Sequence, residues 1–119
     1  MAIRFNHLNI VAAENSKLQH LLVDILGLNV GYRPEFPFGG AWLYQGDKAL
    51  VHIIESKRVQ TCEFGHIAFD VDMNLPVLTH QLNQLSLKYN VRQVPDSAVL
   101  QVFIKLDKLV IELQVIDEK

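Results

Sequence analysis

The sequence has a single cysteine, Cys62, among its 119 residues, which excludes an intrachain disulfide and a cysteine-based zinc cluster. It also lacks an excess of positive charge, because 11 Lys and Arg residues stand against 13 Asp and Glu residues. Domains that bind nucleic acid usually carry a clear basic surplus, so we expect no nucleic-acid partner. No apolar run approaches the ~20 residues that cross a bilayer, and no signal peptide is recognisable. We therefore expect a cytoplasmic protein that does not contact a membrane.

Several functional signatures are missing as well. The sequence contains no Ser-His-Asp arrangement, no glycine-rich phosphate loop and no EF-hand pattern, which argues against the enzyme and calcium-binding classes that depend on them. Half of the residues are hydrophobic and 20% are charged, which is the composition of an ordinary globular domain. We expect one domain over residues 1–119.

Hydrophobic periodicity predicts a chain in which a strand, a helix and three further strands follow one another twice. Alternating or apolar stretches predict strands at residues 3–12, 28–34, 39–46, 49–56, 64–72, 90–94, 98–106 and 108–115. Apolar residues at helical spacing predict helices at residues 15–27 and 74–89. The predicted order is therefore βαβββ in each half of the chain.

The two predicted helices carry start and stop signals. Asn15 or Ser16 is placed to cap the first helix and Gly27 to end it, and Pro76 suits the first turn of the second helix. The residues expected to face the core are Leu18, Leu21, Leu22, Ile25 and Leu26 in the first helix and Leu78, Leu82 and Leu85 in the second.

The two halves resemble each other residue by residue. The first strand of each half contains a histidine, His7 or His66, and these lie 59 residues apart. The last strand of each half contains His52 or Glu112, and these lie 60 residues apart. We therefore predict an α+β fold in which two βαβββ modules, about residues 1–57 and 62–119, form a curved mixed sheet.

The candidate metal ligands are His7, His52, His66 and Glu112. Taken singly, a histidine in a strand is usually structural, and a glutamate can face water. A carboxylate among apolar residues is costly unless a partner or a cation stabilises it. The equivalent places of the four residues in the two modules favour convergence on one cation. By contrast, we interpret His20 and His80 in the predicted helices as surface or packing residues.

Similarity to a known family lies in four segments, FNHLNI, GAWLYQGDKALVHIIE, GHIAFDV and VIELQV. They resemble the vicinal-oxygen-chelate superfamily, and the resemblance covers essentially the whole chain. This group includes glyoxalases, extradiol ring-cleaving dioxygenases, fosfomycin-resistance transferases, methylmalonyl epimerases and bleomycin-resistance binding proteins. The resemblance implies the glyoxalase/dioxygenase-like fold, with metal ligands from the first and fourth strands of each module. These positions are His7, His52, His66 and Glu112.

One position departs from the glyoxalase pattern, because glyoxalases usually have a glutamate where His52 stands. His7, His66 and Glu112 instead resemble the two-histidine, one-carboxylate set of the dioxygenase and fosfomycin-resistance branches, with His52 either as an extra ligand or as a residue that only hydrogen-bonds beside the ligands. Glu112 and His52 are the candidate catalytic residues. Imidazole and carboxylate ligands suit Fe, Mn, Ni or Zn better than Ca.

Substrate-binding residues are less clearly marked. The candidates are Arg33, Trp42, Tyr44 and Lys105, which lie in or beside strands expected to flank the metal site. The alternative interpretation is that the aromatic residues belong to the core and that Arg33 is a surface residue.

Two functions remain open from the sequence. The first is a divalent-metal-dependent enzyme of the glyoxalase/dioxygenase type, a lyase, isomerase or extradiol-type dioxygenase that acts on a small oxygen-rich substrate. Its metal would polarise or chelate adjacent substrate oxygens. The alternative is a metal-free small-molecule binding protein of the bleomycin-resistance type. We expect a homodimer in either case, because short modules leave open sheet edges, and the modules could pair within one chain or between chains.

Overall fold

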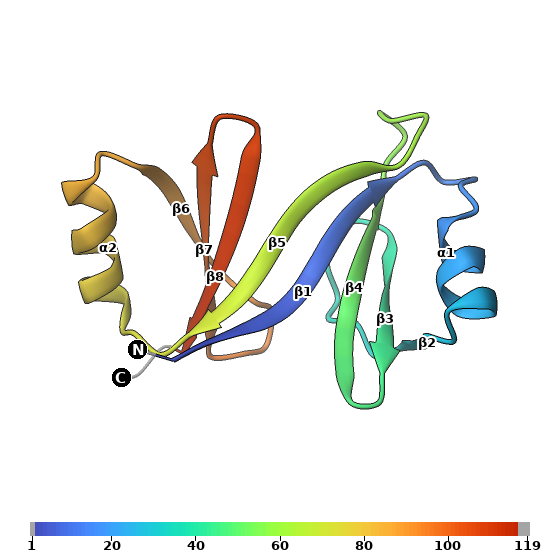
Figure 1. Ribbon diagram of the computed structural model, residues 1–119, viewed down its shortest axis with the longest axis horizontal. Helices are drawn as coiled ribbons and strands as arrows, with labels where there is room; N and C mark the ends of the chain where they lie inside the picture. Colours follow the sequence, from blue (N-terminus) through green and yellow to red (C-terminus); the bar gives the residue numbers. More distant parts are fainter. Residues whose placement is uncertain (1, 117–119) are drawn as a thin grey trace. The chain divides into compact units, whose positions relative to one another are not determined.

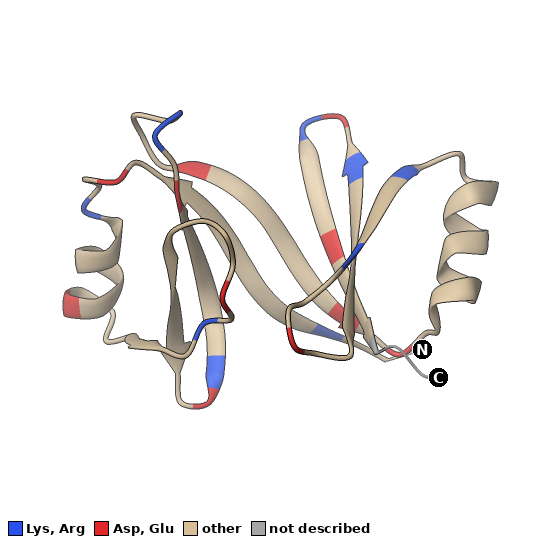
Figure 2. Ribbon diagram, turned by 180° about the vertical axis from the view of Figure 1, so that it is seen from behind, with Lys and Arg blue, Asp and Glu red and all other residues tan. Residues whose placement is uncertain are grey.

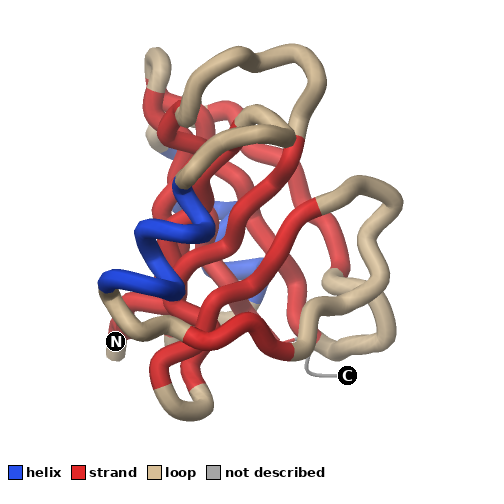
Figure 3. Tube along the Cα trace, turned by 90° about the vertical axis from the view of Figure 1, so that its right-hand side faces the viewer, coloured by secondary structure: helices blue, strands red, loops and turns tan. Residues whose placement is uncertain are grey.

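A computed structural model describes residues 2–116 of the protein. Its elements follow the predicted βαβββ order twice, as Figure 1 shows from blue to red. The first half contains β1 (Ile3–Ala12), α1 (Leu18–His20) with a π-helical continuation (Leu21–Ile25), β2 (Asn29–Gly31), β3 (Gly40–Gln45) and β4 (Lys48–Glu55). The second half contains β5 (Glu63–Val71), α2 (Leu75–Gln84), β6 (Lys88–Gln93), β7 (Val99–Leu106) and β8 (Leu109–Ile116). Strands dominate the regular structure (Figure 3), and none of the described helices is long and apolar enough to cross a membrane.

The chain divides into two compact units that do not coincide with the two halves of the sequence. Of the described residues, 7–65 form the N-terminal unit, and 2–6 together with 66–116 form the C-terminal unit. The start of β1 thus belongs to the C-terminal unit, where the Asn6 amide donates a hydrogen bond to Asp70 at 2.9 Å. The start of β5 belongs to the N-terminal unit. That the whole chain forms one domain stays a prediction.

Each half supplies a mixed arrangement of four strands. The strand order is β2-β3-β4-β1 in the first half and β5-β8-β7-β6 in the second. β1 pairs in parallel with β4, and β5 pairs in parallel with β8. The other neighbours in these two orders are antiparallel. The α+β class and the paired βαβββ modules predicted from the sequence are confirmed.

The second helix, α2, follows the sequence signals except at its last leucine. The Asn74 side chain caps it by accepting a hydrogen bond from the Val77 N–H at 3.0 Å, and Pro76 lies in the first turn. Leu78 and Leu82 are buried, but Leu85 follows the last helical residue and is 71% exposed. The prediction that Leu85 faces the core is wrong, because the helix ends before another turn can bring this side chain to the sheet.

The first helix departs further from the prediction. Its three α-helical residues lead into a π-helical turn, in which the Leu26 N–H donates to the Leu21 carbonyl, five residues earlier, at 3.1 Å. The wider turn rotates the following side chains away from their α-helical positions. Leu22 is buried as predicted, whereas the prediction is wrong for Leu21, Ile25 and Leu26, which are exposed. Gly27 ends the helix as predicted, with a φ of 77° that glycine adopts without strain.

Each unit buries a core between its helical segment and one face of its strands. The N-terminal core contains Ala12, Leu22, Ala41, Leu43 and Ile53. The C-terminal core contains Leu78, Leu82, Val102, Ile104 and Val115. Because side chains alternate along a strand, the intervening residues face the opposite side. The candidate ligands His7, His52 and Glu112 therefore lie on strand faces turned away from the helices.

Candidate functional site

Many charged residues lie in turns and at strand ends, as Figure 2 shows. Glu112 differs from them, because it lies in the middle of β8. It is paired with Ala68 of β5 and with Phe103 of β7. Its exposed fraction is 0%. A carboxylate in such surroundings is costly unless partners stabilise its charge. Glu112 therefore faces the interior of the protein and does not face water.

Three side chains of the C-terminal unit supply partners for this carboxylate. His66 Nε2 lies 2.8 Å from Glu112 Oε1. The side-chain amides of Gln114 and Gln101 donate to Glu112 Oε2 at 2.7 and 3.3 Å. Phe103 meets the His66 ring edge-on, with 5.4 Å between ring centroids. The carboxylate is thus held in one orientation, with an imidazole beside one oxygen and two amides beside the other.

In the N-terminal unit, His7 and His52 belong to a column of three nearly parallel rings. The centroids of His7 and His52 are 3.6 Å apart with 11° between the planes, and those of His52 and Trp42 are 3.8 Å apart with 13°. Strand pairing supports the column, because Trp42 of β3 lies directly opposite His52 of β4. His7 and His52 are both buried. The structure therefore brings His7 to His52 in one unit and His66 to Glu112 in the other.

Asn9 contacts the backbone of His52, although the sequence did not mark it as a candidate site residue. Its buried side-chain amide donates to the His52 backbone carbonyl at 3.2 Å. A Cβ atom at Gly65 would overlap the Asn9 side-chain oxygen, so glycine at this position leaves the space that Asn9 occupies. A signal was present in the sequence, since Asn9 lies two residues after His7 and therefore on the same strand face.

Tyr44, a candidate substrate-binding residue, contacts other residues of the protein through its hydroxyl and its ring. Its hydroxyl donates to the Tyr32 carbonyl at 2.5 Å. Burial raises the pKa of Tyr44, and the neighbouring Tyr32 raises it further. Its ring also covers Gly31, where a Cβ would lie only 2.6 Å from the ring. This hydroxyl is therefore engaged in fixing β2 against β3.

Arg33, a second candidate, lies among aromatic rings. Its guanidinium donates to the Phe38 carbonyl at 2.8 Å and lies 5.1 and 5.3 Å from the ring centroids of Phe36 and Phe38. Burial lowers the pKa of Arg33, and the charge of Glu55 partly counteracts this. The Phe36 ring lies 6.2 Å from that of Trp42. The segment that contains Arg33, Phe36 and Phe38 thus lies beside the column of rings formed by His7, His52 and Trp42.

Lys105, the remaining substrate-binding candidate, is exposed on β7. It lies two residues from Phe103, and therefore on the strand face that carries Glu112. Lys88 of β6 lies directly opposite it, so two like charges meet at the outer strands of the C-terminal unit.

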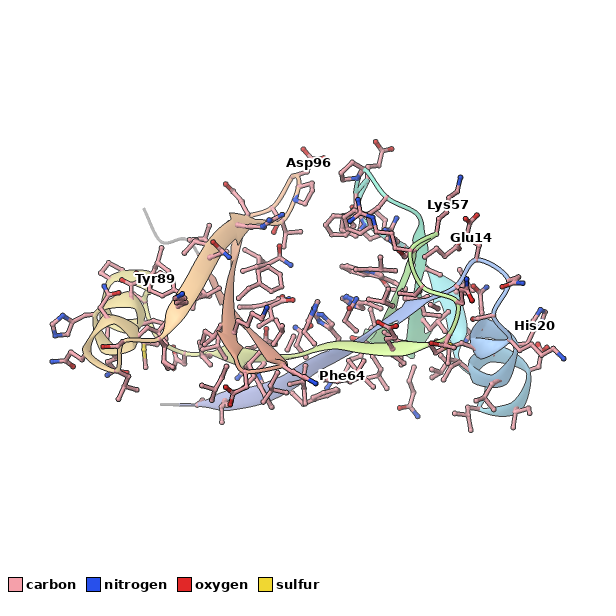
Figure 4. All side chains as sticks on the ribbon, turned by 90° about the horizontal axis from the view of Figure 1, so that it is seen from above. Glu14, His20, Lys57, Phe64, Tyr89 and Asp96 are labelled. Atoms are coloured by element: carbon pink, nitrogen blue, oxygen red, sulfur yellow. The ribbon has the colours of Figure 1, made fainter. Side chains whose placement is uncertain are left out.

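The remaining histidines lie apart from these groups. The His20 side chain is 79% exposed, lies 3.3 Å from Asp24 and points away from the strands in Figure 4. His80 is exposed on α2. Both positions agree with the interpretation of surface residues.

Comparison with known proteins gives likeness at the level of structure. No protein-family model and no curated protein matches the chain. Methylmalonyl-CoA epimerase from Mycobacterium tuberculosis superposes with a TM-score of 0.72 at 15% identity, over 92% of this chain and 85% of that chain. A hypothetical protein from Bacillus halodurans C-125 superposes with a TM-score of 0.75 at 13% identity, over 100% and 98%. The chain shares the fold of these two proteins, the glyoxalase/dioxygenase-like arrangement of two βαβββ modules that the sequence predicts.

Larger proteins share this fold over part of their length. A variant of homoprotocatechuate 2,3-dioxygenase from Brevibacterium fuscum superposes with a TM-score of 0.74 at 15% identity, over 95% of this chain. The chain covers only 32% of that dioxygenase, so it spans about a third of its length. At these identities the likeness concerns the fold, and the named activities are those of the other proteins.

Proposed function

We propose that this protein is a divalent-metal-dependent enzyme that acts on a small oxygen-rich substrate. The observation that carries the proposal is the Glu112 carboxylate, which is fully buried and held between His66 and two amide side chains. Burying a carboxylate charge lowers the stability of the folded protein, and a bound cation would neutralise this charge. The fold shared with an epimerase and with dioxygenases supports the proposal.

The donor atoms fit a first-row divalent ion. In this proposal His66 and Glu112 bind the ion together with His7, which completes the two-histidine, one-carboxylate set expected from the sequence. Two imidazoles and a carboxylate suit Fe, Mn, Ni or Zn better than Ca. The amides of Gln101 and Gln114 would keep the Glu112 carboxylate oriented, as outer hydrogen-bond partners of metal ligands commonly do.

The chemistry follows from this set of donors. A bound divalent ion supplies a Lewis acid that polarises or chelates adjacent substrate oxygens. Since Glu112 contributes one negative charge, the site would remain positive and favour anionic or enolate-like substrate oxygens. Glu112 is the proposed group to accept or return a proton at Oε1. Arg33, Trp42 and Lys105 are the proposed substrate contacts, offering two cations and a flat ring.

The native metal distinguishes the reaction classes within this proposal. Iron or manganese would favour an extradiol-type dioxygenase, because these ions are redox-active. Nickel or zinc would favour a lyase or isomerase, in which proton transfer is the central step.

Elemental analysis of protein purified without chelator tests the proposal. We expect about one Fe, Mn, Ni or Zn ion per chain in the wild type, and loss of this ion in Glu112→Gln and His66→Ala. His80→Ala removes an exposed histidine of α2 and should retain the ion, which makes it the matched control. A wild-type protein that contains no transition metal, and binds none when each ion is added, would refute the proposal.

The segment with Arg33, Phe36 and Phe38 in the N-terminal unit favours a second candidate function, that of a metal-free binding protein of the bleomycin-resistance type. Phe36 and Phe38 stack with 5.2 Å between centroids, and Arg33 lies over both rings. Stacked rings with a cation suit a flat, anionic ligand. A ligand that binds equally well to EDTA-treated and metal-loaded protein would favour this candidate, whereas metal-dependent binding would favour the enzyme.

A further inference from the structure

We propose that His52 is a positioning residue that fixes the ring plane of His7, and that it is not a fourth metal ligand. The inference rests on the proposed function, because it assigns roles around the ion that His7 is proposed to bind. The sequence alone left open whether His52 binds the metal ion.

The stacking geometry carries this assignment. A histidine binds a metal ion through a nitrogen lone pair that lies in the ring plane, at about 2.0–2.1 Å for zinc. The planes of His7 and His52 differ by 11°, and their centroids are 3.6 Å apart. Stacked rings stay about 3.5 Å apart at van der Waals contact. An ion in the plane of His7 therefore lies about that far from the plane of His52, beyond the reach of either His52 nitrogen.

Contacts on its other side hold His52 in place. Trp42 covers the second face of the His52 ring at 3.8 Å, from the directly opposite position on β3. Asn9 of β1 donates to the His52 backbone carbonyl at 3.2 Å. The His52 ring is thus clamped between two rings, and its backbone is tied to the strand that carries His7.

The fixed, flat ring of His52 can hold the His7 ring in one orientation. The outer torsion of a histidine side chain has broad minima, so the side chain alone does not select one ring plane. Contact with His52 selects a plane without using a ring nitrogen of either residue. The important property of residue 52 is therefore a flat ring and not a nitrogen donor.

Two replacements separate these properties. His52→Phe keeps a flat ring and removes both nitrogens, whereas His52→Ala removes the ring as well. If His52 positions His7, Phe should restore what Ala loses. If His52 is a ligand, the two variants should be equally defective.

The first measurement needs no metal. Trp42 is the single tryptophan of the chain, so its fluorescence reports on the ring column. In metal-free protein we expect H52A to shift the emission to longer wavelength, because one face of the indole loses its ring neighbour. H52F should stay close to the wild type.

The second measurement is the binding of Co(II), followed by chelator competition and by the visible absorption spectrum. H52F should bind within about threefold of the wild type and keep its spectrum, because the phenyl ring preserves the stack. H52A should bind about 10- to 100-fold more weakly, the usual effect of losing a residue that orients a ligand. His7→Phe, the ligand control, should lose the wild-type spectrum.

The outcomes separate this assignment from the proposed function. An H52F protein that loses the Co(II) spectrum as His7→Phe does would make His52 a ligand and overturn the assignment. An H52A protein that binds Co(II) as tightly as the wild type would overturn it too. A wild type that binds no ion would remove the proposed function and the assignment together, and the fluorescence would still show whether the ring column exists.

Discussion

Gly65→Ala is expected to destabilise the protein strongly, because the space beside Gly65 is already filled. An added Cβ would overlap the Asn9 side-chain oxygen and lie 2.9 Å from Asn9 Cγ and 3.0 Å from the Asn9 carbonyl oxygen. Asn9 would have to move and give up its hydrogen bond to the His52 carbonyl. Overpacking costs about 1–3 kcal/mol, and a lost buried hydrogen bond costs about 1–3 kcal/mol. The expected loss is about 2–6 kcal/mol, a large part of the ~5–15 kcal/mol that stabilises a typical domain.

Urea unfolding followed by circular dichroism measures this loss. Gly39→Ala is the matched control, since a Cβ there lies an ordinary 3.9 Å from Glu55, and its effect should stay within about 0.5 kcal/mol. Adding Asn9→Ala to Gly65→Ala removes most of the overlap, so the double variant should be more stable than the sum of the single effects predicts, by about 1 kcal/mol. A Gly65→Ala protein as stable as Gly39→Ala would refute the packing argument.

Three further predictions concern stability and assembly. Asn74→Ala removes the cap of α2 and should cost about 1 kcal/mol in urea unfolding, whereas Asn83→Ala in the same helix should cost nothing; equal effects would contradict the capping argument. Because burial raises the pKa of Tyr44 in the folded state, its contribution to stability is complete below the unfolded pKa of about 10 and is lost as pH rises. The unfolding free energy of Tyr44→Phe should therefore fall less than that of the wild type as the pH rises through the titration range of tyrosine. An equal fall in the two proteins would contradict the raised pKa of Tyr44. Light scattering should give about twice the 13.6 kDa mass of one chain for the homodimer expected from open sheet edges, and a stable monomer would exclude both the dimer and any exchange of modules between chains.

The order of the elements could be predicted because its signals are local. Asn74 and Pro76 mark the start of α2 within three residues of chain, and the alternation in β1 and β8 shows which residues share a face. The first helix could not be predicted in the same way. Its π-helical turn changes the spacing of side chains, so Ile25 and Leu26 are exposed although the sequence places them on an α-helical stripe.

The site was predictable only in part, for a related reason. The repeat marked His66 and Glu112 as counterparts of His7 and His52, and the structure places His66 beside Glu112. The ring column depends on the register of β3 against β4, which shifts between Leu43 and Tyr44. A slip of one residue would turn Trp42 to the opposite face, and no local pattern in the sequence fixes that register.

The exchange of strand ends between the two units has a consequence for how the protein can be divided. The hydrogen bond from Asn6 to Asp70 joins residues 64 positions apart, so a long loop must close before the C-terminal unit is complete. Cutting the chain between its two halves would leave both compact units incomplete, because each half contains residues that belong to the unit formed mainly by the other half. Halves produced separately should therefore fold poorly until they are mixed, and neither βαβββ segment could serve as an autonomous building block.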